Sequence, residues 1–341
     1  MSRDDNGNEN TKNNNMFLIG AGFTKAVFPE APLNKDLFHA VVSSDPKTKL
    51  GLYSKKYGTE DIEILLTRMD LETEELQSER LRRDRETIKQ DLAKYFERFR
   101  FCVSNHENNK WLEDFATKLF QPNDSIITTN YDCFLEGLLD YYNLWHPKEG
   151  YVNAYDPSEN ANFPKKRVNP KGIKFYKIHG SENFRECDVL NDEGITGQTI
   201  IGFIINESIY PLSGKNSTLG WVKKHSKEYI IAPSFVKIPH FQIADTVNEA
   251  ILAAQNAQNM VICGSSLRNE DGFVRLILTG FMSKGLQNKK KLITVDPNAD
   301  SILERIEKFW IDGTHNITFH KIPKNIEEGL GDLIKLLEDF E

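Results

Sequence analysis

Short, continuous apolar runs alternate along the chain with longer stretches in which apolar residues recur every three or four positions. The first run, at 16–19, is closed by glycines at positions 20 and 22. Such runs, bounded by turn residues, are typical of strands buried on both faces. Further strand-like runs follow at 125–129, 174–178, 199–205, 228–231, 259–263, 291–295 and 316–320. Helical patterns lie at 133–142, 245–255, 271–283, 301–310 and 326–340. This alternation predicts an α/β fold with a doubly wound parallel, Rossmann-like sheet.

Two segments interrupt the alternation. Residues 30–120 are mostly helical in pattern, and Leu81, Ile88 and Leu92 fall on one face of a long helix whose other face is charged. Residues 143–230 form a smaller predicted insertion, which is irregular where Asn, Pro and Lys dominate and strand-like toward its end. Residues 1–15 hold six asparagines and almost nothing apolar, which predicts a disordered tail. The rest of the chain, 16–341, is expected to be one domain that carries both insertions.

The net charge and the lengths of the apolar runs exclude two classes of partner, nucleic acids and membranes. Lys and Arg number 43 against 50 Asp and Glu, a formal net charge of −7. Phosphate contacts to nucleic acid need a clustered basic face, so direct nucleic-acid binding is not expected. The arginines between positions 80 and 85 are interleaved with acids and are interpreted as a solvated helix face. The apolar runs are far shorter than the roughly 20 residues of a membrane helix, and no signal-like segment opens the chain. We therefore expect a cytoplasmic protein without membrane contact.

The cysteines argue against a metal. Cys102, Cys133, Cys187 and Cys263 lie far apart, and no two form a Cys-x-x-Cys pair. A structural zinc site takes its ligands from such close pairs. In a cytoplasmic chain disulfides are not expected either. We predict no metal site and interpret the cysteines as small buried hydrophobic residues.

Small and polar residues collect immediately after five of the strand-like runs. In an open parallel sheet, ligands bind outside the carboxyl ends of the strands, so these clusters predict one shared pocket. The residues placed there are Gly20, Ala21, Gly22, Phe23 and Thr24 after the first run, Thr129, Asn130 and Asp132 after the second, His179 after the third, and then Gly264, Ser265, Ser266 and Asp296 after two later runs.

The chemistry of these residues narrows the ligand. Gly20 and Gly22 let the backbone approach a pyrophosphate, and the N-terminus of the following helix favours an anion. Lys25 replaces the third glycine of the dehydrogenase fingerprint, and no acidic residue follows a second strand about 20 residues on, so hydride transfer is not supported. His179 is a natural base near neutral pH. Asp132 fits a ligand contact and a helix cap equally well.

Four ordered motifs resemble the sirtuin-like family. They are Gly20-Ala21-Gly22-Phe23-Thr24, Thr128-Thr129-Asn130-Tyr131-Asp132, Lys177-Ile178-His179-Gly180-Ser181 and Gly264-Ser265-Ser266-Leu267-Arg268. The resemblance implies that the first motif binds the phosphates of NAD, that Asn130 and Asp132 line the site of the nicotinamide ribose, and that His179 is the catalytic base. It also implies that the late Gly-Ser-Ser motif and Asp296 hold the ribose on the adenine side.

Departures from the family pattern point to one branch. The four-cysteine zinc module of deacylase sirtuins is absent, and residues 231–235 stand where their acyl-lysine clamp is expected. The four motifs without these two features are similar to the bacterial antiphage-defence branch of the family, whose members hydrolyse NAD. The resemblance therefore implies an NAD glycohydrolase that releases nicotinamide and ADP-ribose, with Asn130 and His179 as the catalytic residues and NAD as its substrate.

The same resemblance implies a toxic effector that acts as a homo-oligomer, with a separately encoded ATPase, helicase-like or nucleotide-processing partner, or both. Two other functions stay open: an NAD-dependent protein deacylase and a non-catalytic sensor of NAD or ADP-ribose. A sensor would be expected to have lost Asn130 or His179, and both are present. Because both residues are placed at strand ends, their truncation to alanine is expected to cost little stability.

Overall fold

The computed structural model describes residues 14–154, 171–191, 194–204, 226–268, 271–283, 289–309 and 316–338, with side chains described outside 189–197. The predicted tail lies outside the described residues except at its end. Asn15, which was assigned to that tail, is instead the first residue of a buried strand. Its backbone N–H donates to the Asp124 carboxylate, and its side chain accepts a hydrogen bond from Asn259. These polar partners allow an asparagine to lie inside the protein.

Six parallel strands form the central sheet, in the order β3-β2-β1-β7-β8-β9. The strands are β1 (Asn15–Ile19), β2 (Ser125–Thr128), β3 (Lys174–Lys177), β7 (Asn259–Cys263), β8 (Lys290–Val295) and β9 (Ile317–Ile322). The predicted doubly wound parallel sheet is confirmed. Ile19 pairs with Thr128 on one side and with Cys263 on the other, so three central strands end level with one another. The chain reverses direction across the sheet at β1, and this is where doubly wound folds bind ligands.

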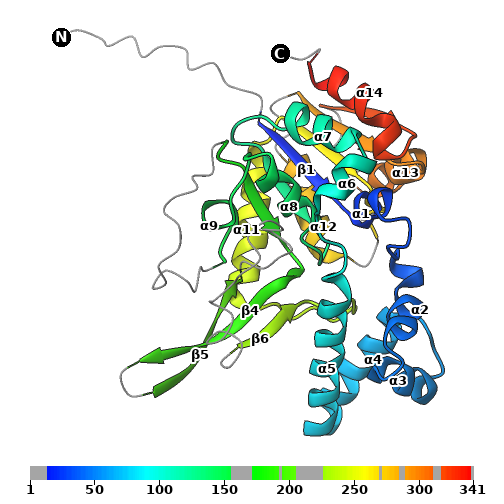
Figure 1. Cartoon of the computed structure of the whole chain (residues 1–341), viewed down its shortest axis with the longest axis vertical. Coiled ribbons are helices and arrows are strands. Elements are labelled where there is room, and N and C mark those ends of the chain that lie inside the picture. The colour runs from blue at the N-terminus through cyan, green and yellow to red at the C-terminus, as the bar shows by residue number, and fades with distance from the viewer. Residues whose placement is uncertain are drawn as a thin grey trace.

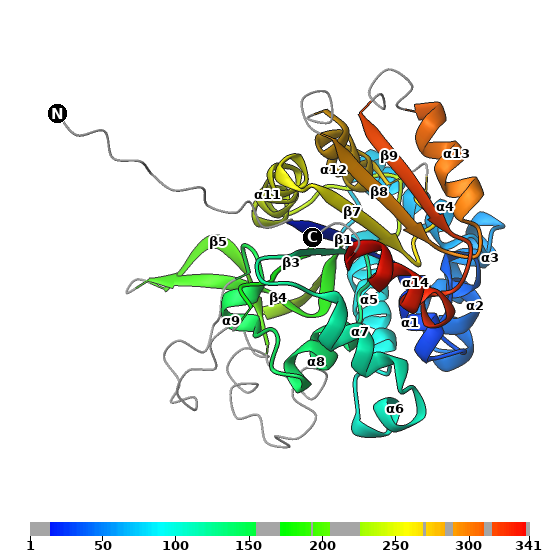
Figure 2. The ribbon, with the colours of Figure 1, turned by 90° about the horizontal axis from the view of Figure 1, so that it is seen from above.

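Helices cover both faces of the sheet (Figure 2). The alternation of β1 shows why: Phe17 and Ile19 belong to one hydrophobic core, whereas Met16 and Leu18 belong to another. The first core takes most of its helical side chains from α1 (Ala21–Val27), α7 (Trp111–Leu119), α8 (Phe134–Tyr141) and α14 (Ile326–Glu338), and Ile243 joins it from the following group of helices. The second takes them from α11 (Phe241–Asn256), α12 (Gly272–Ser283) and α13 (Ala299–Phe309). Two short helices, α6 (Val103–Asn108) and α9 (Pro147–Gly150), lie in the connections.

Four helices after the first α-helix form a bundle beside the sheet, which we call the helical module (residues 34–96). It comprises α2 (Asn34–Ser44), α3 (Lys49–Tyr57), α4 (Ile62–Leu76) and α5 (Glu79–Phe96). In Figure 1 it extends away from the sheet. Asp61 and Ser78 cap α4 and α5 by accepting backbone N–H groups, and Leu81, Ile88 and Leu92 are buried in the module's own core. By contrast, the buried side chains of α7 belong to a core of the main sheet, so along this insertion the module's core ends at Phe99.

A second sheet of three antiparallel strands, in the order β5-β4-β6, stands next to the main one (Figure 1). It contains β4 (Gly180–Asn191), β5 (Gly194–Phe203) and β6 (Ser226–Ile230). The sequence predicted no strand where β4 lies. Its polar residues conceal it, because several of them are buried against other elements: Ser181 donates to the carbonyl of Tyr131, and Asn183 donates to that of Ile204. The strands predicted at 199–205 and 228–231 therefore belong to this antiparallel sheet and not to the parallel one.

Among the described residues, no helix is both long and apolar enough to cross a membrane. The predicted arginine cluster on α5 is largely paired with acids. Arg82 contacts Glu79, and Arg85 makes a two-pronged contact with Asp70 of α4. Arg80, Arg82 and Arg83 are exposed, as the interpretation of a solvated helix face requires, whereas Arg85 is 12% exposed and joins α5 to α4.

Candidate functional site

A cavity of about 1010 Å³ lies at the carboxyl ends of the central strands and faces the helical module. This volume is at the upper end of the range for small-molecule and cofactor sites. Twelve of the thirteen residues placed at the pocket from the sequence line it: Gly20, Ala21, Gly22, Thr24, Thr129, Asn130, Asp132, His179, Gly264, Ser265, Ser266 and Asp296. Phe23 does not. Its side chain is buried in the core against Phe115, so only its backbone borders the β1–α1 turn.

The glycines hold two loops together at the floor of the cavity. The N–H of Gly22 donates to the carbonyl of Gly264, at 2.8 Å. A Cβ atom on Gly20 would lie 2.6 Å from that same carbonyl oxygen, and one on Gly22 would lie 2.8 Å from the Gly264 Cα. Gly264 itself has a φ of +59°, in the left-handed region. The contact between loops accounts for these three glycines before any ligand is considered.

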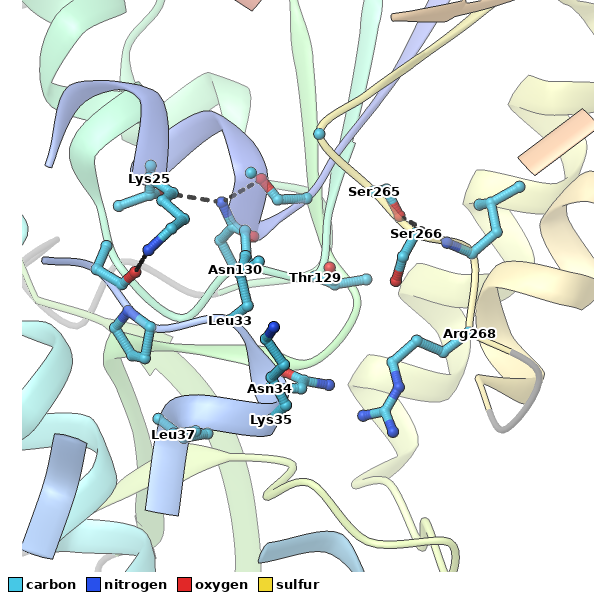
Figure 3. A pocket seen from close by; sticks show the side chains of 18 of the residues that line it. Lys25, Leu33, Asn34, Lys35, Leu37, Thr129, Asn130, Ser265, Ser266 and Arg268 are labelled. Atoms are coloured by element: carbon cyan, nitrogen blue, oxygen red, sulfur yellow. Dashed lines mark hydrogen bonds between the residues drawn. The ribbon is translucent and has the colours of Figure 1, made fainter. Parts of the chain in front are cut away.

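Asn130 is fixed by hydrogen bonds to the first loop. Its Nδ2 group donates to the carbonyl of Gly20 and to Oγ1 of Thr24, both at 3.1 Å, which uses both amide hydrogens. In Figure 3 its side chain reaches toward this loop, while Ser265, Ser266 and Arg268 lie across the pocket. With its donors committed, the amide offers its oxygen to a ligand as a hydrogen-bond acceptor. The sequence predicted that truncation of Asn130 costs little stability; these two hydrogen bonds predict a larger cost.

Asp132 lines the cavity but is only 5% exposed, and both of its carboxylate oxygens have partners within the protein. Its Oδ2 accepts a hydrogen bond from Thr24, and its Oδ1 accepts the N–H of Phe134 at the start of α8. Burial raises its pKa to about 6, although the nearby Lys177 ammonium acts in the opposite direction. Of its two sequence interpretations, the structural one accounts for all of these contacts. Through Thr24, Asp132 supports the position of Asn130.

His179 enters the cavity from the turn between β3 and β4, and it meets two charged groups. Its Nε2 lies 3.2 Å from an Asp271 carboxylate oxygen and 3.1 Å from the Lys237 ammonium. Lys237 also donates to Asp271, at 3.1 Å. Burial alone would raise the pKa of Asp271, but its contacts with His179 and with the Lys237 ammonium outweigh burial and hold that pKa well below its usual range. The imidazole therefore faces an ionised carboxylate.

The far side of the cavity carries the residues assigned to the adenine-side ribose. Asp296 follows β8 and is half-buried, and its carboxylate accepts the N–H of Asn298. Arg305 of α13 donates to the carbonyl of Ser266, at 2.6 Å. Nearer the helical module, Arg268 forms an ion pair with Glu63 of α4. Contacts of two arginines thus join separate elements along this side of the cavity.

Sequence reasoning missed Lys237, Asp271 and Glu63. Asp271 opens a predicted helix, and a cap is the ordinary interpretation of an aspartate there. Nothing local distinguishes Lys237 from the other lysines, because its contact with His179 joins positions 58 residues apart. Only the fold brings these side chains together.

Among the described residues, no three His, Cys, Asp or Glu side chains are grouped so that they could hold a metal ion. All four cysteines are described, and none is in a disulfide. Burial raises the pKa values of Cys133 and Cys263 well above their usual range, which keeps both thiols protonated and unreactive. That the protein binds no metal stays a prediction.

The sheet order, together with a polar pocket at the point where the chain reverses across it, defines the class of open α/β proteins that bind nucleotide-like ligands at a switch point. Within this class, the family model described as a SIR2-like domain matches residues 124–317, and the chain belongs to this family.

Several solved Sir2 structures are similar to the chain. A Sir2 homologue in complex with NAD is 11% identical, with a TM-score of 0.40, over 96% of this chain and 91% of that chain. Sir2Tm bound to a propionylated peptide is 14% identical, with a TM-score of 0.36, over 96% of this chain and 92% of that chain. No curated protein matches the chain.

Proposed function

We propose that the protein binds NAD and hydrolyses it to nicotinamide and ADP-ribose. The observation that carries this proposal is the convergence of Asn130 and His179 on one cavity large enough for a dinucleotide. Membership in the SIR2-like family supports NAD as the ligand. The three glycines that join the loops leave the cavity floor without side chains, so a ligand can lie close to the backbone.

The reaction breaks the bond between the nicotinamide nitrogen and the ribose carbon, and the bonding electrons leave with nicotinamide. The ribose carbon becomes oxocarbenium-like, and fixed dipoles in a water-poor site stabilise such a centre. A water molecule forms the new bond to this carbon and loses a proton, which His179 accepts. The amide oxygen of Asn130 accepts a hydrogen bond from the water or from a ribose hydroxyl and so orients it. Neither step calls for a covalent intermediate on the protein.

Water as the nucleophile is favoured over an acyl-lysine peptide by the segment that takes the place of the peptide clamp. Ser234 donates to Asp70 of α4 at 2.7 Å, and the N–H of Phe235 donates to Thr67 at 2.9 Å. The next N–H, of Val236, donates back to the Ser234 hydroxyl. A peptide that docks as an added strand needs free backbone groups along the segment it joins. Here Thr67 of the helical module accepts the N–H of Phe235, and Ser234 accepts that of Val236.

The test separates hydrolysis from deacylation. We expect purified protein, at concentrations that allow it to assemble, to convert NAD to equal amounts of nicotinamide and ADP-ribose, at a rate that an acetyl-lysine peptide does not raise. Liquid chromatography with mass spectrometry resolves nicotinamide, ADP-ribose, cyclic ADP-ribose and acyl-ADP-ribose in one run. Nicotinamide release that appears only when peptide is added would favour the deacylase. Binding of NAD without any product would favour the sensor.

We propose further that this activity makes the protein a cytoplasmic effector of antiphage defence that kills an infected cell by depleting NAD. The support is the likeness of its motifs to that branch. Because an unrestrained NAD hydrolase would kill its own host, the proposal includes control by homo-oligomerisation, by a separately encoded ATPase, helicase-like or nucleotide-processing partner, or by both. Full activity of a purified monomer without an activator would contradict this control.

A further inference from the structure

Three charged or titratable side chains from three separate elements meet at the inner end of the cavity. His179 comes from the β3–β4 turn, Asp271 immediately precedes α12, and Lys237 lies in the loop between β6 and α11. Their side chains are 9%, 13% and 15% exposed, respectively. Each contacts the other two at 3.1–3.3 Å. Because the three side chains are largely buried, the charges of Asp271 and Lys237 act on His179 more strongly than the charges of exposed ion pairs would.

The loop that carries Lys237 is anchored at its base. Ser234, which is only 2% exposed, donates to Asp70 of α4, and Asp70 also receives both prongs of Arg85 from α5. Three residues further along, Lys237 extends back into the cavity, with its ammonium 5.7 Å from the centre of the Phe273 ring. The helical module therefore fixes the position from which this lysine reaches His179.

We propose that Asp271 and Lys237 are positioning residues of His179, an opposed-charge pair that holds the imidazole in place and sets the pH at which it acts as a base. The role assigned to His179 rests on the proposed function. When the imidazole accepts a proton, the Asp271 carboxylate compensates the new positive charge. The Lys237 ammonium opposes that charge. Loss of either residue upsets the balance, in opposite directions.

Few other titratable or charged groups face the imidazole from the described elements around it. Tyr131, on the β2–α8 loop, lies with its ring centre 6.4 Å from that of His179, and burial keeps its hydroxyl protonated by raising its pKa well above the usual range. On the surrounding elements, Glu63 is paired with Arg268 and Asp70 is paired with Arg85. Changes at Asp271 or Lys237 are therefore the direct way to alter the charge that His179 experiences.

Two substitutions are expected to move the pH–rate profile in opposite directions. In Asp271→Asn the rising limb of kcat moves to lower pH, because the protonated imidazole has lost its counter-charge. In Lys237→Met the same limb moves to higher pH, so the rate at neutral pH falls. We expect kcat to fall about 100-fold or more in Asp271→Asn, in the range of losses when a general base is disturbed, while KM changes little.

Both variants are designed to fold. Asn caps a helix as well as Asp does, so the Asp271 contact with the N–H of Val274 has a replacement. Met keeps the apolar stem of Lys237 beside Phe273. Lys237→Arg restores the positive charge and is expected to return the limb toward its wild-type position. Lys118→Met serves as the matched control, because it removes a lysine from an exposed ion pair with Asp114 on α7, away from the cavity.

A readout that needs no activity completes the experiment. The ring resonances of His179, assigned by their loss in His179→Ala, are followed by NMR as the pH is varied in wild type and in each variant. Midpoints that move down in Asp271→Asn, up in Lys237→Met and not at all in Lys118→Met support the proposal. Unchanged or same-direction midpoints in folded Asp271→Asn and Lys237→Met overturn it. If wild type fails to cleave NAD, the proposed function falls, and the ring titration still decides the pairing.

Discussion

Truncation of Asn130 to alanine tests whether this side chain serves chemistry or only the fold. The change removes two hydrogen bonds of 3.1 Å, to the Gly20 carbonyl and to Thr24 Oγ1. A net value of about 1 kcal/mol per hydrogen bond predicts a loss of about 1–2 kcal/mol in the free energy of unfolding, because water can enter the cavity and replace part of each bond. The loss of one positioned polar group at a reacting centre predicts a fall of about 100- to 1,000-fold in nicotinamide release.

The matched variant is Thr24→Val, which changes the hydrogen-bond partner of Asn130 in the same network. It removes the acceptor of Asn130 and the donor to Asp132 but leaves the Asn130 amide oxygen in place. We expect a similar loss of stability with a much smaller loss of rate. Urea unfolding and single-turnover nicotinamide release, measured on both variants, separate the two effects. If Asn130→Ala and Thr24→Val lose the same activity, or if Asn130→Ala keeps the wild-type rate, the catalytic role of Asn130 is wrong.

Three further predictions concern packing and charge around the site. Gly20→Ala forces a methyl group against the neighbouring loop, and we expect it to lower the free energy of unfolding by about 1–3 kcal/mol and to weaken NAD binding. Gly51→Ala, in α3, meets only open space, and we expect it to raise the free energy of unfolding by about 0.5–1 kcal/mol in thermal or urea melts. Lys177→Met leaves the buried Glu136 carboxylate without its 2.8 Å partner and should cost about 3–5 kcal/mol, much of which the added change Glu136→Gln should restore. Burial raises the pKa of Asp124 to about 7, so the native state keeps this carboxyl protonated to higher pH than the unfolded chain does. The free energy of unfolding should therefore fall as the pH rises from about 4 to about 7. Asp124→Asn should flatten this dependence in urea unfolding midpoints.

The main sheet could be predicted from the sequence because its signals are local. Each parallel strand is buried on both faces and therefore has a continuous apolar run, as in residues 16–19. The end of each run marks the edge where a pocket forms. For that reason the glycine loop, Asn130 and His179 could be placed on one cavity before the fold was known.

What the sequence did not reveal depends on contacts between distant residues. Strand β4 carries buried polar side chains whose partners lie elsewhere in the fold, so no alternation of apolar and polar residues marks it. The contacts of Lys237 with His179 and Asp271 form only after the helical module fixes the loop that carries the lysine. Likewise, the glycines of the first loop were attributed to phosphate binding, whereas their nearest neighbour is the Gly264 backbone.

The most direct test of the account is the fate of NAD in water labelled with heavy oxygen. Hydrolysis at the cavity of Asn130 and His179 predicts ADP-ribose that carries one heavy oxygen on the ribose carbon released from nicotinamide. It also predicts an equal amount of nicotinamide, and neither product from His179→Ala. The measurement is mass spectrometry of the products after incubation of the wild-type protein, over a range of concentrations that allows assembly, with NAD and no peptide. Intact NAD throughout, or labelled ADP-ribose formed equally by folded His179→Ala, would contradict the account.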